Sequence, residues 1–93
     1  MTGTGTPAAV HMVSLSWTES TSSNIAGYNI YRAIYNSACG AYSKINSGLN
    51  VTTTYTDTSV VDGETYCYVT TAVDWSDAES GCSNTAEAVI PPL

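Results

Sequence analysis

Basic side chains are almost absent from this sequence. Of its 93 residues, two are Lys or Arg and eight are Asp or Glu, which gives a formal net charge of −6. Proteins that bind nucleic acid cluster Lys and Arg to replace the counterions of the phosphates, and anionic membrane surfaces attract the same side chains. The sequence also contains no run of eighteen apolar residues, so no segment is expected to cross a bilayer as a helix. We therefore expect no nucleic acid and no membrane among its partners.

Groups that carry catalysis are scarce as well. His11 is the single histidine, so a Ser–His–Asp or Cys–His arrangement would depend on it, and we expect it to be exposed at the start of a strand. The acidic residues fall mostly in predicted loops, whereas glycoside hydrolysis needs two carboxylates that face each other in a cleft. The sequence has no glycine-rich phosphate loop and no Cys-x-x-Cys zinc motif. It thus predicts no catalytic residue, no metal site and no cofactor.

The residues that are present favour β-strands. Thr, Val and Tyr are frequent, while Lys, Arg and Gln, which are common on helix surfaces, are nearly missing. Apolar and polar residues alternate in several short segments, and in one of them Val13, Leu15 and Trp17 are expected to point inward. Strands about ten residues apart with turn signals between them indicate a β-sandwich. The predicted strands cover residues 11–18, 27–34, 42–45, 53–57, 65–74 and 82–90.

Three motifs make this prediction more specific. VSLSW ends at Trp17, GYNIYR covers 27–32, and VVDGETY at 60–66 leads into the run YCYVTTAVD. In this order and spacing they resemble the fibronectin type III-like domain of large secreted bacterial proteins. The resemblance implies an all-β, immunoglobulin-like sandwich of about seven antiparallel strands, in which the hydroxyl of a corner tyrosine, Tyr66, bonds back to the preceding turn. It also implies a structural core made of Trp17, Tyr28, Ile30, Tyr55, Tyr66, Tyr68 and Ala72.

The N-terminal residues carry a second resemblance. TGTGT at 2–6 is similar to the end of an immunoglobulin-like domain that often precedes this family in longer chains. We therefore expect residues 1–8 to be a lead-in and residues 9–93 to form the domain, with a short first strand. The lead-in lacks the charged and apolar regions of a signal peptide, so an export signal is expected in a longer precursor.

The three cysteines leave one without a partner in the chain. In the fold that the resemblance implies, Cys39 and Cys67 lie at the same end of neighbouring strands, so a Cys39–Cys67 disulfide is expected, with Cys67 on the outer face of its sheet. Such a bridge implies an oxidising, extracellular or cell-surface location. Two alternatives stay open for Cys82: a half-buried small apolar side chain, or a free or intermolecular thiol.

The predicted loop at 75–81 and the outer sheet face supply the candidate partner contacts. Trp75 is suited to stacking on a sugar or to anchoring a protein; the alternative is that it folds over its own hairpin. Asp74, Asp77 and Glu79 could offer oxygen ligands to calcium, but their spacing is not that of an EF-hand, and a solvated acidic loop is the expectation. Tyr31 belongs to an outer aromatic face. The candidate contact residues are thus Trp75, Asp77, Glu79 and Tyr31.

Three functions are compatible with these features. The first is a non-catalytic accessory module of a secreted or surface bacterial protein. It would act as a spacer or adhesion domain that contacts neighbouring domains, a protein or a carbohydrate. The second is a structural subunit that self-associates by strand addition at an open sheet edge, with residues 1–10 as the donor. The third is an engineered binding scaffold.

Overall fold

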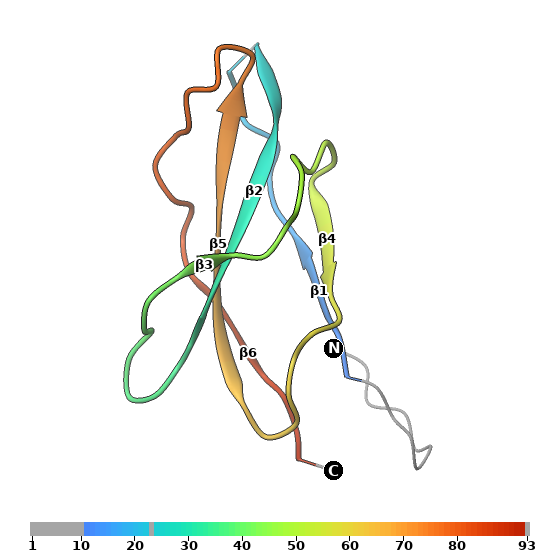
Figure 1. The fold of residues 1–93 in the computed structure, drawn as a ribbon, viewed down its shortest axis with the longest axis vertical. Helices are drawn as coiled ribbons and strands as arrows, with labels where there is room; N and C mark the ends of the chain where they lie inside the picture. The colour runs from blue at the N-terminus through green and yellow to red at the C-terminus, as the bar shows by residue number, and fades with distance from the viewer. Residues whose placement is uncertain (1–10, 23, 93) are drawn as a thin grey trace.

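The computed structural model describes residues 11–22 and 24–92, and these form an all-β fold (Figure 1). The lead-in and the short first strand that the resemblance implies before residue 11 lie outside the described residues. Within the described ranges no helix is long and apolar enough to cross a membrane. The strands are β1 (Val13–Ser16), β2 (Ile25–Ile34), β3 (Ser43–Lys44), β4 (Thr54–Asp57), β5 (Thr65–Asp74) and β6 (Ala86–Val89).

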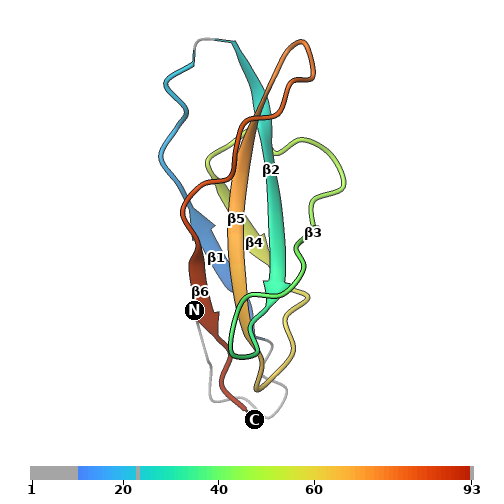
Figure 2. The ribbon, with the colours of Figure 1, turned by 90° about the vertical axis from the view of Figure 1, so that its left-hand side faces the viewer.

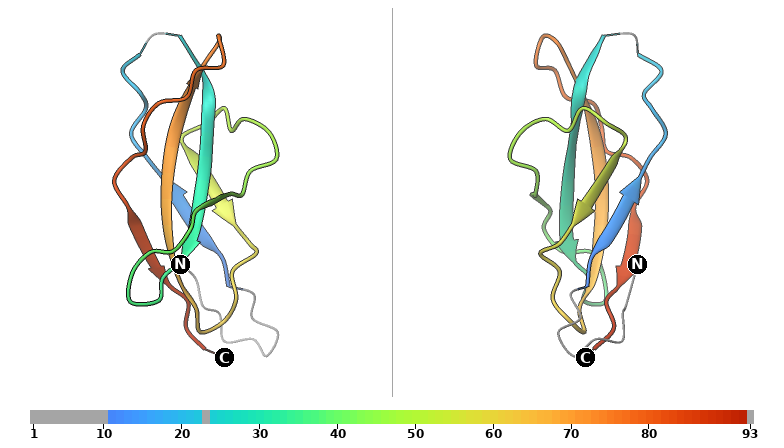
Figure 3. Two further views of the ribbon diagram at one scale, coloured as in Figure 1. Left: turned by 60° about the vertical axis from the view of Figure 1, so that its left-hand side comes forward. Right: turned by 90° about the vertical axis from the view of Figure 1, so that its right-hand side faces the viewer.

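The strands form two antiparallel sheets that face each other. One sheet contains β1 and β4, and the other has the order β3–β2–β5–β6. β2 and β5 are ten residues long and pair along most of their length, so they form the central pair of strands in the larger sheet. Figures 2 and 3 show the short β1–β4 pair lying across one face of this sheet. The predicted antiparallel sandwich is confirmed.

The hydrophobic core fills the space between the two sheets. Because side chains alternate along a strand, every second residue of β2 and β5 faces this space. Trp17 and Tyr55 are partly buried beside it, and the rings of Trp17 and Tyr28 meet edge to face with their centroids 5.5 Å apart. The Tyr66 hydroxyl accepts a hydrogen bond from the amide of Val61 at 2.9 Å, which is the corner arrangement that the resemblance implied. The buried cluster at the centre of the core consists of Val13, Ile30, Tyr66, Tyr68 and Ile90.

His11 is buried, which corrects the prediction that it is a solvated surface residue. Its exposed fraction is 6%, and its Nε2 lies 3.2 Å from Oδ1 of Asp62. His11 is buried because side chains alternate along an extended chain. It lies two residues before Val13 and therefore on the same inward face.

The start of β2 is held close to the connection between β3 and β4. The β2–β5 register shifts between Ile25 and Gly27, and the amide and carbonyl of Tyr28 each bond to Asn50 at 2.9 Å. A Cβ on Gly27 would lie 2.9 Å from the Cβ of Leu49 and 3.1 Å from the carbonyl oxygen of Asn50. Both atoms belong to or adjoin the backbone, so neither can swing away.

We therefore expect Gly27→Ala to lower the free energy of unfolding by about 1–3 kcal/mol, the usual cost of overpacking. Urea denaturation measures the effect. Gly48→Ala is the matched control, because a Cβ there meets no atom within 4 Å. Equal stability of the two variants would show that the backbone contact at Gly27 is not constrained.

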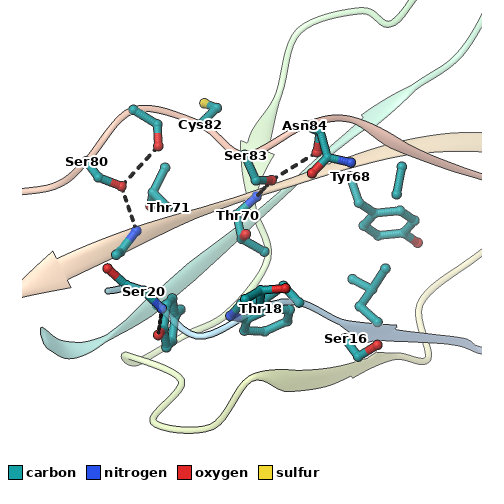
Figure 4. Close-up of a pocket in the computed structure, with 16 residues that line it drawn as sticks. Ser16, Thr18, Ser20, Tyr68, Thr70, Thr71, Ser80, Cys82, Ser83 and Asn84 are labelled. Atoms are coloured by element: carbon teal, nitrogen blue, oxygen red, sulfur yellow. Dashed lines mark hydrogen bonds between the residues drawn. The ribbon is translucent and has the colours of Figure 1, made fainter. Parts of the chain in front are cut away.

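The last predicted strand is shorter than expected, because a bulge interrupts its pairing with β5. The amide of Ser80 bonds to the carbonyl of Ala72, and that of Ser83 to the carbonyl of Thr70. Three residues on one segment thus span two on the other, which is one residue too many for a regular ladder. The serine hydroxyls accept from the amides of Ala72 and Thr70 at 2.9 Å each, as Figure 4 shows.

Candidate interaction surface

One carboxylate gathers hydrogen bonds across the outer face of the larger sheet. Oε2 of Glu79 accepts from the side chains of Asn29 at 3.2 Å, Tyr31 at 2.5 Å and Thr71. Asn29 and Thr71 are register partners on β2 and β5, and Glu79 reaches them because its backbone bridges to Val73. We call these four residues, Asn29, Tyr31, Thr71 and Glu79, the Glu79 cluster.

The Glu79 cluster is charged on its carboxylate and neutral on its phenol. Hydrogen bonds from Thr71, Tyr31 and Asn29 hold the pKa of Glu79 below its ordinary value. The same hydrogen bond to Glu79 raises the pKa of Tyr31. The carboxylate therefore remains an acceptor with a fixed orientation at neutral pH.

A buried asparagine anchors this cluster from below. The side chain of Asn46 is 6% exposed and donates to Oδ1 of Asn29 at 3.0 Å, while its own oxygen accepts from the amide of Ile30 at 2.8 Å. Asn46 lies shortly after β3, where the backbone ladder to β2 ends. Its side-chain amide continues the pairing with β2 in place of backbone groups. The network therefore runs from the middle of β2 to the outer surface.

A shallow hollow of about 400 Å³ lies next to the cluster. Tyr42, directly before β3, is 37% exposed and forms one wall, and Lys44 is the register partner of Tyr31. The bulge after Glu79 leaves Cys82 exposed at the rim, so of the two alternatives for Cys82 the half-buried side chain is wrong and the free, accessible thiol holds. The hollow is lined by Tyr31, Tyr42, Val69, Thr71, Glu79, Ser80 and Cys82.

Two predicted contact residues lie apart from the cluster, at the tip of the β5–β6 connection. Trp75 is 77% exposed, so it does not fold over its own hairpin. Asp77 has a φ of 72°, in the left-handed region. The structure thus brings together Tyr31 and Glu79, but places Trp75 and Asp77 beyond the end of β5.

The acidic loop is organised by its own backbone. Oδ1 of Asp74 accepts from the amides of Ser76 and Ala78, each at 2.9 Å, and from the Ser76 hydroxyl. The Ala78 amide is the first cause of the lowered pKa of Asp74. Within residues 11–22 and 24–92, no group of three or more His, Cys, Asp or Glu is placed to hold a metal. The carboxylate of Asp74 therefore stabilises its own turn through these hydrogen bonds.

The disulfide of the structure joins Cys39 to Cys67, with Cα atoms 6.0 Å apart. Cys67 lies between the core tyrosines of β5 and therefore on the opposite, outer face, where it is nevertheless fully buried. The loop that carries Cys39 returns to β2, with Gly40 bonded to the carbonyl of Ile34 and Tyr35 bridged to Cys39. The disulfide and these bonds hold the connection between β2 and β3 against the outer face of β5.

Sequence reasoning missed three members of the polar network: Asn29, Asn46 and Thr71. Alternation does place Asn29 with Tyr31, and Thr71 with Val69, on the outer faces of their strands. The register that makes Asn29 face Thr71, and the bulge that brings Glu79 over them, depend on long-range pairing. Asn46 directly follows the predicted strand 42–45, and nothing in its local sequence indicates burial.

The chain has relatives among large bacterial enzymes. No protein-family model matches it. Over 77 residues it is 48% identical to an amylopullulanase of Thermoanaerobacter thermohydrosulfuricus and 46% identical to one of Thermoanaerobacterium thermosulfurigenes. Each match covers 82% of this chain but only 5% and 4% of the two enzymes, so the chain spans a small part of these curated relatives.

Solved structures share the fold over nearly the whole chain. The twitchin kinase region of C. elegans aligns with a TM-score of 0.73 at 20% identity, over 88% of this chain and 14% of that one. The crystal structure of an Fn3-like protein from Clostridium thermocellum aligns with a TM-score of 0.70 at 30% identity, over 90% of this chain and 81% of that one. With this identity and coverage, the chain belongs to the fibronectin type III-like family.

Proposed function

We propose that this domain is a non-catalytic accessory module of a longer, exported carbohydrate-processing enzyme. In that role it spaces neighbouring domains and offers the outer face of the larger sheet for contact. The observation that carries the proposal is the 48% identity to a segment that makes up 5% of an amylopullulanase. Such a segment is long enough to fold as a sandwich but too short to contain the reacting site of a large enzyme.

The chemistry of the domain supports the same role. Three of its eight acids are engaged in structure: Asp57 with Arg32, Asp74 with its own turn, and Glu79 with the outer face. Export is supported by the Cys39–Cys67 disulfide, which persists in oxidising compartments.

Assays of the isolated chain test this proposal. We expect one cooperative unfolding transition and no release of reducing ends from pullulan or starch. Release of reducing ends by the purified, folded chain would contradict the proposal.

Assembly by strand addition is a second candidate, favoured by the free edge of β1. In the part of the chain that the structure describes, β1 pairs with β4 alone. A groove of about 450 Å³ separates β1 from the segment around Ser80–Ala86, and Nε1 of Trp17, in its lining, is buried without a described hydrogen-bond partner. An added strand would fill this groove and supply acceptors.

Size-exclusion chromatography with and without residues 1–10 tests the assembly. The candidate requires an oligomer in at least one of the two forms. A monomer in both would remove it, and would leave the accessory-module proposal untouched.

A further inference from the structure

We infer that the hollow beside the Glu79 cluster is a binding subsite for a neutral glucose polymer. This inference rests on the proposed function and names the ligand class of its contact surface. The subsite is formed by Tyr31 and Tyr42 as walls, by the carboxylate of Glu79 as acceptor, and by Thr71 and Ser80 at its margin.

The two tyrosines provide the stacking surface. Tyr31 lies on β2 opposite Lys44, and Tyr42 lies two residues before Lys44, so both rings belong to the outer face and are diagonal neighbours. Tyr42 is 37% exposed, which leaves ring area free, and Tyr31 is fixed by its hydroxyl bond to Glu79. An aromatic ring with a polar edge suits a sugar, whose ring faces carry C–H groups and whose rim carries hydroxyls.

Glu79 offers a preorganised acceptor beside these rings. Three donors converge on its Oε2, and among the described residues no donor reaches Oε1. A ligand hydroxyl that donates to Oε1 therefore meets a side chain that is already ordered, and avoids much of the entropy cost of immobilising it. A charged acceptor also makes the hydrogen bond stronger than a neutral one would.

The charge of the domain disfavours an anionic ligand. The net charge of −6 repels anionic polymers. Arg32 is bonded to Asp57, and this leaves Lys44 near Glu79 as the cation of the surface. The relatives are amylopullulanases, a name that indicates pullulan and starch-type chains, and both are neutral glucose polymers. Charge thus argues against anionic polymers, and the relationship favours a neutral glucose polymer as the occupant.

A chemical-shift titration of the ¹⁵N-labelled chain with maltoheptaose tests the subsite. We expect weak binding, with a Kd on the order of 1 mM, and shifts centred on Tyr31, Val69 and Thr71. Tyr42→Ala should weaken binding about tenfold by removing one stacking wall. Glu79→Gln should weaken it by about three- to tenfold, because the amide oxygen can still accept from the cluster while an NH₂ replaces the free acceptor.

Trp75→Ala is the matched control, since it removes an exposed aromatic side chain outside the hollow. Its binding should stay within about twofold of the unmodified chain. No shifts at 20-fold the expected Kd, shifts that disappear in Trp75→Ala instead of Tyr42→Ala, or binding of a Lys-rich peptide in place of maltoheptaose would each overturn the inference. The titration measures binding and not the release of reducing ends. A failure of this inference is therefore distinguishable from a failure of the proposed function, which the reducing-end assay tests.

Discussion

Replacing Asp57 by Ala should lower the free energy of unfolding by about 3–5 kcal/mol, the cost of removing one partner from a buried ion pair. Asp57 is 3% exposed at the end of β4, and its Oδ2 accepts from Arg32 at 2.9 Å and from the Tyr68 hydroxyl at 2.7 Å. Arg32 and Tyr68 belong to the opposite sheet, so this carboxylate joins the two layers. In Asp57→Ala, the Tyr68 hydroxyl would remain between the sheets without an acceptor, and Arg32 would keep only the hydroxyl of Ser59.

Asp57→Asn isolates the contribution of the charge. The amide keeps the shape and one acceptor, so we expect a loss of about 1–3 kcal/mol. Asp77→Asn controls for net charge, because Asp77 is exposed at the loop tip and Asn tolerates its left-handed backbone. Chemical denaturation at pH 7 measures all three variants. If Asp57→Ala matched Asp77→Asn, the contact between the sheets would contribute nothing to stability.

The same residue should give the fold an acid-sensitive component. Burial acts to raise the pKa of Asp57, but hydrogen bonds from Tyr68, Ser59 and Arg32 outweigh it and hold the pKa below its ordinary value of 3.8. A lowered pKa in the folded state adds stability above the unfolded value, and this stability is lost as the pH falls. The unfolding free energy should therefore decline below about pH 4, and the decline should be shallower in Asp57→Asn.

Removing the disulfide is the second change with a large expected effect. The bridge closes a loop with a sequence separation of 28, for which the chain-entropy model gives roughly 3–4 kcal/mol. For a domain of this size, a loss of that amount lowers Tm by about 15–25 °C. We expect this loss in the double variant Cys39→Ala, Cys67→Ala, measured by scanning calorimetry.

Cys82→Ser is the control for the disulfide variant. Cys82 is exposed on the bulge after Ser80, so its replacement should change stability by less than about 0.5 kcal/mol. A double variant as stable as the control would mean that the loop carrying Cys39 is held by its other contacts, such as the bond from Gly40 to Ile34.

The sequence predicted the fold more fully than the surface, for a physical reason. Strand positions and inward faces follow from local alternation, which is why Val13, Ile30, Tyr66 and Tyr68 could be assigned to the core. His11 obeys the same rule and was misjudged because a histidine at a strand start is usually solvated. The start of the last strand was wrong because Ser80 and Ser83 replace a regular ladder with a bulge.

The candidate surface depends on information that local patterns do not contain. Tyr31 and Glu79 were both expected to be contact residues, but their meeting requires the β2–β5 register and the bridge from Glu79 to Val73. Trp75, a loop aromatic and predicted contact residue, lies at the tip of the β5–β6 connection and apart from the Glu79 cluster. A pair register fixes which residues become neighbours across strands, and it is set by the whole sheet.

Exchange of this chain into a relative tests most directly the claim that it is a non-catalytic module of a larger enzyme. The chain would replace the matching segment of the Thermoanaerobacter thermohydrosulfuricus amylopullulanase, and kcat would be measured on a short soluble maltooligosaccharide. The account predicts a kcat within about twofold of the parent, because no reacting group is exchanged. A folded exchange enzyme whose kcat falls about 100-fold or more would contradict it, because this segment would then contribute to the reacting site.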